Sequence, residues 1–252
     1  MSLMIVKAYK THKITRSDTD IFGILDKYLP SIKENSIVVI TSKIVAICEG
    51  RIIPVNKADK DKLVEEESEY YLSKTENKYN ISLTIKNNLL IPTAGIDESN
   101  ANGNYILWPK NPQKTANEIR VYLKKKNQVK NLGVIISDSK TTPLRWGVTG
   151  AAIAHSGFSA INDKIGTPDI FGKPLLVTKV NVSDALASSA VLLMGEGNEQ
   201  TPLAVITDVP FVDFQDRNPS DEEIKMLHID INDDLYSTLL KNAPWKKGKS
   251  GK

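Results

Sequence analysis

The segments Pro92-Thr-Ala-Gly-Ile-Asp-Glu-Ser-Asn-Ala101 and Val134-Ile-Ile-Ser-Asp-Ser139 decide how this sequence is interpreted. In each segment an apolar run ends abruptly at an aspartate, and the second run predicts a buried strand. Carboxylates with hydroxyl neighbours are the ligands that Mg²⁺ and Mn²⁺ prefer. The pattern therefore predicts a metal site formed by Asp97, Asp138 and Ser139. The alternative is that each aspartate accepts backbone N–H groups within a turn.

Composition indicates an ordinary globular protein and excludes several functional classes. The 252 residues are 40% hydrophobic and 25% charged, with a net charge of +3. A chain of this length can bury one large core or two small ones. The single Cys48 excludes an intrachain disulfide. Because there is no basic stripe with interleaved aromatics, no signal peptide and no apolar run near 18 residues, we expect a cytoplasmic protein that binds neither nucleic acid nor membrane.

The pattern of apolar runs predicts one domain over residues 4–245, whose size allows two lobes, followed by a disordered basic tail at 246–252. The expected strands span 37–40, 52–55, 175–182 and 203–207, and the expected helices span 42–48, 59–78, 115–126 and 183–194. Strands and helices alternate only loosely, without the regular rhythm of a doubly wound sheet. We therefore predict an α+β fold with mixed sheets and flanking helices.

Three further features are candidates for chemistry. The loop Gly195–Pro202 carries two glycines, which let backbone N–H groups approach a phosphate; the alternative is a helix C-cap and a connecting loop. Arg145 follows Asp138 closely and either binds a carboxylate or phosphate bidentately or forms a structural ion pair. His155 lies in the small, apolar segment 147–157 and is predicted to be a core histidine, because no acidic residue is near it in sequence.

Taken in chain order, these and other segments resemble the motifs of one family, the coenzyme F420-0:L-glutamate ligases, also called γ-glutamyl ligases. The resemblance extends over about residues 37 to 210. The segments that carry it are Thr41-Ser-Lys-Ile-Val45, Glu49-Gly-Arg51, Ala94-Gly-Ile-Asp-Glu-Ser-Asn100, Ile136-Ser-Asp-Ser139, Arg145-x-Gly147, Ala152-Ile-Ala-x-Ser-Gly157, Asp163-x-x-Gly-x-x-Asp-x-x-Gly172 and Leu192-Leu-Met-Gly-Glu-Gly197.

The resemblance implies an F420 ligase-like fold that forms an intertwined homodimer. It also implies a reaction in which GTP and divalent metal, with two Mg²⁺ or Mn²⁺ ions allowed, join L-glutamate to a carboxylate-bearing acceptor such as F420-0. The carboxylate is activated as an acyl phosphate, so charge neutralisation matters more than a protein nucleophile. By match to the family's motifs, the metal ligands are Asp97, Asp138, Ser139 and Glu196, the nucleotide contacts are Ser42, Lys43, Asn100, Gly195, Glu196, Gly197 and Asn198, and the catalytic residues are Asp138 and Arg145.

Several positions depart from the family's pattern, among them Ala46 and Cys48 beside Ile47, and Thr93 where an asparagine is expected. Ile47 stands where a lysine is expected, Thr141 where a glycine is expected, and Thr142 and Trp146 where arginines are expected. Lys140 can supply part of the lost positive charge. The departures leave two alternatives to the ligase: a non-catalytic nucleotide- and metal-binding or scaffold protein of the same fold, and an amide ligase with a different acceptor.

Overall fold

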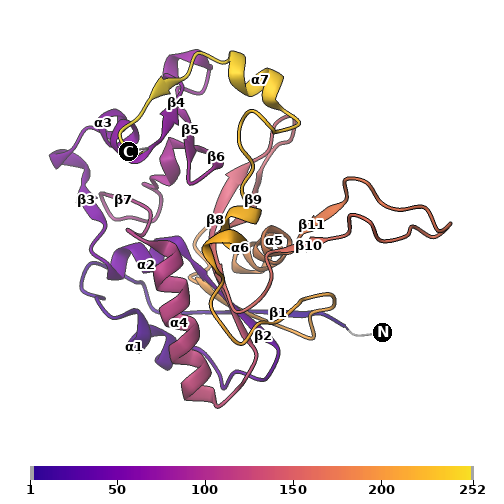
Figure 1. Ribbon diagram of the computed structural model, residues 1–252. Coiled ribbons are helices and arrows are strands. Elements are labelled where there is room, and N and C mark those ends of the chain that lie inside the picture. The colour runs from indigo at the N-terminus through magenta and orange to yellow at the C-terminus, as the bar shows by residue number, and fades with distance from the viewer. Residues whose placement is uncertain (1–2, 251–252) are drawn as a thin grey trace.

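A five-stranded sheet forms the centre of the protein (Figure 1). In this computed structural model, which describes residues 3–250, the strand order is β1 (Ile5–Tyr9), β12 (Leu203–Thr207), β2 (Ser36–Thr41), β8 (Leu132–Thr141) and β9 (Val148–Ser156). Strands β2 and β8 run parallel, whereas the other neighbours are antiparallel. The mixed sheet confirms the predicted α+β class, and the strands expected at 37–40 and 203–207 are present.

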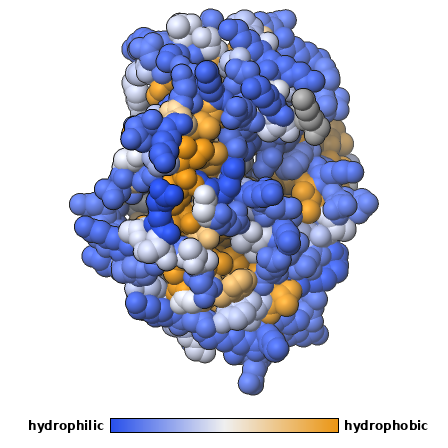
Figure 2. Space-filling model, turned by 90° about the vertical axis from the view of Figure 1, so that its left-hand side faces the viewer, coloured by the Kyte–Doolittle hydropathy of each residue, from blue (hydrophilic) through white to orange (hydrophobic). Residues whose placement is uncertain are grey.

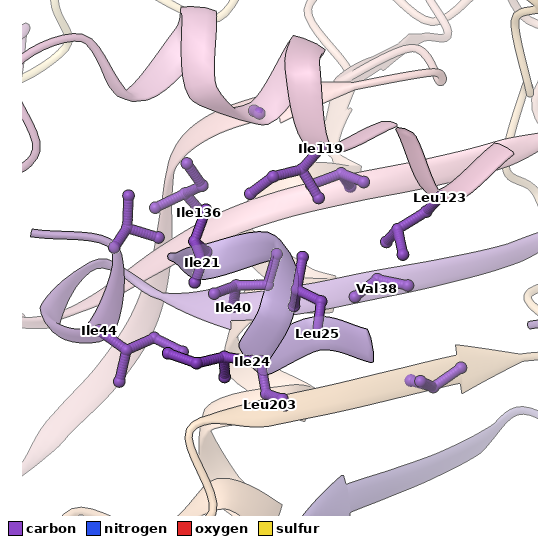
Figure 3. Close-up of a cluster of buried hydrophobic side chains, with 14 of the residues drawn as sticks. Ile21, Ile24, Leu25, Val38, Ile40, Ile44, Ile119, Leu123, Ile136 and Leu203 are labelled. Atoms are coloured by element: carbon purple, nitrogen blue, oxygen red, sulfur yellow. The ribbon is translucent and has the colours of Figure 1, made fainter. Parts of the chain in front are cut away.

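Helices cover both faces of this sheet. One face packs against α1 (Ile21–Tyr28), α2 (Ser42–Cys48) and α4 (Pro112–Asn127), and the other against α5 (Val182–Met194). Successive strand residues point to opposite faces. Val38 and Ile40 therefore join the first cluster (Figure 3), whereas Ile37 and Val39 pack with α5. Burial on both faces explains why this strand is apolar without interruption.

The helix boundaries follow the capping chemistry. Helix α4 begins before the expected residue 115 because Asn111 accepts from the Lys114 N–H at 2.9 Å and proline occupies the first turn. Helix α5 begins one residue before the expected residue 183. Asn181 is its cap, because the Asn181 side chain accepts from the Asp184 N–H at 2.9 Å. Gly195 ends α5, as predicted, with φ of +77°.

A smaller lobe holds the short strands. Its elements are the sheet β13 (Lys246–Lys247), β4 (Tyr70–Tyr71), β5 (Leu83–Lys86) and β6 (Leu89–Pro92), the pair β3 (Ile52–Pro54) and β7 (Asn104–Ile106), helix α3 (Lys60–Glu67), and the 3₁₀ turns η1 (Val55–Lys57), η2 (Lys74–Glu76) and η3 (Thr93–Gly95). The helix expected over 59–78 is wrong beyond α3, because the chain turns there and continues as β4, which pairs with β5. The local apolar spacing did not reveal this long-range pairing.

The end of the chain returns to this lobe. After α6 (Asp221–Met226) and α7 (Ser237–Asn242), strand β13 pairs with β4, and the Gly248 N–H donates to the Glu69 carbonyl at 2.8 Å. The disordered tail expected at 246–252 is therefore wrong for residues 246–250; residues 251–252 lie outside the described range. Backbone pairing to an open strand edge outweighs the repulsion between neighbouring lysines there.

A long arm projects from the main lobe (Figure 1). It consists of β10 (Ile161–Asp163), β11 (Lys179–Asn181) and the residues between them. The strand expected at 175–182 is thus confirmed only at β11. No helix in residues 3–250 is long and apolar enough to cross a membrane. The face shown in Figure 2 is mostly hydrophilic, with a narrow band of hydrophobic residues.

Candidate functional site

The topology of the main sheet brings three candidate segments to one edge. Strands β2 and β8 are parallel and in register, with Thr41 opposite Ser137, so the carboxyl end of β2 lies beside the part of β8 that carries Asp138. Lys43 and Asp138 follow directly. The Thr41 N–H donates to the Pro202 carbonyl at 3.0 Å, which brings the glycine-bearing loop to the same edge.

A register shift in the sheet lies immediately before Asp138. Ile136 pairs with Ala154, whereas Ser137 pairs with Ala152, so Ile153 is left as the extra residue on β9. Bulges of this kind re-aim side chains and are common beside active sites. Here the bulge separates the buried part of β8 from the part that carries Asp138 and Ser139.

Asp97 reaches the site from the smaller lobe through a strained turn. Thr93, Ala94 and Gly95 all have positive φ, of 52°, 54° and 72°. The turn is held because the Ala94 N–H donates to the Thr84 hydroxyl at 2.9 Å. Asp97 then exchanges two backbone hydrogen bonds with Ile106, at 2.9 and 2.8 Å. Backbone strain that is over-determined in this way is typical of functional sites.

Lys43 joins α2 to the Asp97 loop. Its ammonium lies 2.6 Å from Asp97 Oδ2 and donates to the Ser99 carbonyl at 3.3 Å. The Ser99 N–H and hydroxyl donate to Asp97 Oδ1 at 2.7 and 2.8 Å. Burial alone would raise the pKa of Asp97, but the Lys43 charge and the Ser99 hydrogen bonds outweigh it and lower that pKa. Asp97 therefore stays ionised.

Asp138 has a different environment. Its Oδ2 accepts from the indole N–H of Trp108, and its Oδ1 accepts from the Ser139 N–H at 2.8 Å. Burial raises the pKa of Asp138 to about 6, and the nearby charge of Asp97 adds to the rise. Each carboxylate oxygen has one N–H partner and retains a lone pair, so Asp138 can still bind a cation.

The loop after α5 completes the arrangement. The Asn100 amide donates to the Gly197 carbonyl at 2.8 Å, which links the Asp97 loop to this segment. The Ser139 hydroxyl hydrogen-bonds the Glu196 carboxyl, whose pKa is raised, chiefly by burial. Glu199 accepts from the Gly197 N–H at 2.8 Å and holds the loop in shape.

The donor chemistry of this corner suits a divalent cation. Asp97, Asp138 and Glu196 all interact electrostatically with Lys43, so when all are ionised three carboxylates face one ammonium, a formal charge of −2. Within residues 3–250 no group of three or more His, Cys, Asp or Glu side chains is close enough together to hold a metal ion. Mg²⁺ is commonly bound by only one or two carboxylates, with water and substrate phosphates as its other ligands. The donors present fit that mode.

Three site residues expected from the sequence form no side-chain hydrogen bond or ion pair with the corner within residues 3–250. Arg145 lies in the exposed turn between β8 and β9, and its backbone N–H donates to the Thr142 carbonyl at 3.2 Å. Ser42 is buried in the first turn of α2, and Asn198 is exposed in the loop after α5. The corner itself contains Lys43, Asp97, Asn100, Asp138, Ser139, Glu196 and Gly197, with Gly195 adjacent.

The positions that depart from the family pattern fall in two environments. Ile47 is 6% exposed and packs in an apolar cluster with Ile106. Thr141, Thr142 and Trp146 are exposed around the hairpin turn. Lys140 is paired with Asp184, at 3.3 Å.

Trp108, Lys86 and Glu67 also belong to this region and are not predicted from the sequence. Trp108 is 1% exposed, and the Lys86 ammonium lies 5.1 Å from its ring centroid and 2.8 Å from a Glu67 oxygen. No local motif marks these residues. The one sequence feature that relates to Trp108 is Gly95, because the Trp108 indole occupies the place that a side chain would take there.

Comparisons with known proteins identify relatives of this chain. The family model described as F420-0:Gamma-glutamyl ligase matches residues 4–208. The chain is 34% identical over 214 residues to the coenzyme F420:L-glutamate ligase of Methanococcus maripaludis strain C7, which covers 79% of this chain and 85% of that protein. It is 33% identical over 218 residues to the enzyme of the same name from Methanocaldococcus jannaschii, covering 77% of this chain and 85% of that protein.

Proposed function

Because the chain belongs to the F420-0:gamma-glutamyl ligase family, we propose that it is an amide ligase that joins the amine of L-glutamate to a carboxylate of an F420-0-like acceptor, using GTP. The observation that carries the proposal is the corner where Lys43, Asp97, Asp138 and Glu196 meet from four separate segments. A corner rich in oxygen donors that also holds a lysine can bind a nucleotide together with a divalent cation.

The proposed reaction has two steps. An oxygen of the acceptor carboxylate attacks the γ-phosphorus of GTP, and GDP leaves as the acyl phosphate forms. The amine of glutamate then attacks the acyl carbon, phosphate departs with the former carboxylate oxygen, and the amine loses a proton. In both steps negative charge develops on oxygens of the reacting groups. Positioning of the reactants and neutralisation of that charge therefore supply most of the rate enhancement.

The residues of the corner divide this work. Asp97, Asp138 and the Ser139 hydroxyl would hold a divalent ion, which when bound would supply positive charge to the nucleotide phosphates. Lys43 is the cationic side chain of the corner, and its 2.6 Å pair with Asp97 leaves it in reach of the same site. We expect Lys43 to exchange Asp97 for phosphate when nucleotide and metal bind. The Asn100–Gly197 hydrogen bond holds the loop that approaches the phosphates.

We also propose that the protein is a homodimer. The arm between β10 and β11 exposes large apolar side chains, among them Ile170 at 91%, Phe171 at 82% and Val177 at 84%. Apolar side chains gathered on a projecting segment are typical of subunit contacts. Light scattering during size-exclusion chromatography should give twice the chain mass, and Phe171→Ser should shift the equilibrium toward a monomer.

One alternative is supported by a specific observation. Trp146 is 90% exposed on the β8–β9 hairpin and contacts Tyr79 edge to face, with ring centroids 6.4 Å apart. An aromatic pair at this position can accept a planar acceptor other than F420-0. If GTP hydrolysis is coupled to glutamate but not to F420-0, the reaction class stands and the acceptor is different.

The test of the proposed function is phosphate release in the presence of GTP, Mn²⁺, L-glutamate and F420-0. We expect release only when all four are present, and we expect Asp138→Asn to abolish it. Asp26→Asn is the matched control, because Asp26 pairs with Lys126 on the surface at 2.6 Å. Normal turnover by Asp138→Asn would refute the site. Failure of the wild type to bind GTP or Mn²⁺ by calorimetry would favour the non-catalytic scaffold.

A further inference from the structure

Trp108 connects the two carboxylate segments of the corner. Its backbone follows β7, and its indole is 1% exposed. The indole N–H donates to Asp138 Oδ2, across 30 positions of sequence. The same nitrogen lies against Gly95, two residues before Asp97, so closely that a Cβ there would overlap it. One side chain therefore contacts both the strand that carries Asp138 and the turn that leads to Asp97.

A partly buried ionic network lies beside Trp108. The Arg51 Nε donates to the Trp108 carbonyl at 3.0 Å, and another nitrogen of Arg51 lies 2.6 Å from Glu67. Glu67 also pairs with Lys86 at 2.8 Å. The Lys86 ammonium in turn lies 5.1 Å from the centroid of the indole ring. The network thus holds the Trp108 backbone through Arg51 and places a cation against the face of its ring through Lys86.

From this geometry we infer that Trp108 is a positioning residue for the corner: its indole N–H fixes the orientation of the Asp138 carboxylate toward the cation. The inference rests on the proposed function, since it concerns the cation-binding side chain of that site. With Oδ2 held by the indole and Oδ1 by the Ser139 N–H, the carboxylate cannot rotate without losing a hydrogen bond. The lone pair that remains on each oxygen is thereby held in a fixed direction. Partners that orient a metal ligand in this way typically change metal affinity by about 10–100-fold when they are removed.

The inference also gives Gly95 a physical role. At this position φ is +72°, which glycine adopts readily, and the space of a side chain is occupied by the Trp108 ring. The glycine therefore allows the indole to pass beneath the Asp97 turn and reach Asp138. Lys86 contributes through the ring, because a cation over the π face draws electron density and strengthens the N–H as a donor.

The experiment compares Mn²⁺ affinity, measured by calorimetry without nucleotide or substrates, in the wild type, Trp108→Phe and Trp245→Phe. Trp245 is the matched control, because its indole N–H also donates, to the Leu240 carbonyl at 2.6 Å, but in the C-terminal segment. We expect the dissociation constant to rise about 10–100-fold in Trp108→Phe and to be unchanged in Trp245→Phe. In the ligase assay, the Mn²⁺ concentration for half-maximal activity should rise in the same proportion, whereas kcat at saturating Mn²⁺ should fall by a smaller factor.

Wild-type affinity for Mn²⁺ in a folded Trp108→Phe overturns the inference and leaves the proposed function intact. Conversely, a wild type that binds Mn²⁺ but forms no amide refutes the proposed function, while the inference is still judged by the affinity ratio. A wild type that binds no Mn²⁺ either alone or in the presence of GTP overturns both. If Trp108→Phe does not unfold cooperatively, nuclear magnetic resonance of the wild type replaces it, with indole N–H signals assigned through Trp146→Phe and Trp245→Phe. On titration with Mg²⁺ the Trp108 signal should shift and that of Trp245 should not; a stationary Trp108 signal under saturating Mg²⁺ refutes the inference.

Discussion

His155 should make the protein less stable in acid by an amount that can be isolated. The side chain is 2% exposed and packs edge to face on Phe158, with centroids 5.5 Å apart. It is the core histidine that the sequence predicts, but among the described residues its Nε2 has no hydrogen-bond partner. Burial lowers the pKa of His155 from 6.5 to about 4. The neutral imidazole is therefore the form that the folded protein accommodates.

The sign and size of the effect follow from linkage. Between these two pKa values the unfolded chain binds the proton more readily than the folded one, so stability rises with pH across that window. The stabilisation is complete above about pH 6.5 and is lost as the pH falls to about 4. At about 1.4 kcal/mol for each pKa unit, His155 costs the protein about 3 kcal/mol of unfolding free energy on going from pH 7.5 to 4.

Urea denaturation of the wild type and of His155→Leu at several pH values measures this contribution. The comparison at pH 7.5 gives the packing difference between the two side chains. Relative to that value, the wild type should lose about 3 kcal/mol more than the variant by pH 4. Unfolding free energies that fall in parallel for the two proteins would refute the assignment of a neutral, buried His155.

Three other outcomes follow from packing and burial. Gly95→Ala should lower the free energy of unfolding by about 2–4 kcal/mol in urea, because its Cβ overlaps Trp108 and φ is +72°; a loss under about 0.5 kcal/mol would contradict it. Gly150→Ala should cost about 1–3 kcal/mol and lower Tm, because its Cβ would lie 2.5 Å from the Ala187 carbonyl oxygen; an unchanged Tm would show that α5 moves freely. Burial raises the pKa of Cys48 to about 12, so iodoacetamide at pH 8 should alkylate it at least about 100-fold more slowly than free cysteine, and equal rates would contradict this.

The elements that can be predicted from the sequence are those determined by the local order of apolar and polar residues. The apolar run at 37–40 is buried on both faces, and such runs are distinctive. Asp97 and Asp138 are predicted to share a site because each ends an apolar run. In the structure Lys43 forms an ion pair with Asp97, and its charge also acts on Asp138. Helix α4 is also predicted from a local pattern, because its apolar residues repeat at helical spacing.

What could not be predicted depends on contacts between distant segments. The chain after Glu67 leaves its helix to pair as β4, and β13 closes on the same strand from the end of the chain. Nothing within a window of ten residues encodes such pairing. The role of Trp108 is of the same kind, because its partner Asp138 lies 30 positions away. Arg145 shows the converse: nearness in sequence to Asp138 did not bring it into the corner.

The measurement that tests the central claim most directly uses F420-0 labelled with ¹⁸O in its carboxylate. The protein is incubated with this acceptor, GTP, Mn²⁺ and L-glutamate, and the inorganic phosphate is analysed by mass spectrometry. Activation of the carboxylate as an acyl phosphate predicts that each amide formed transfers one ¹⁸O atom to phosphate. Amide formation with unlabelled phosphate, or phosphate release without amide, would contradict the account.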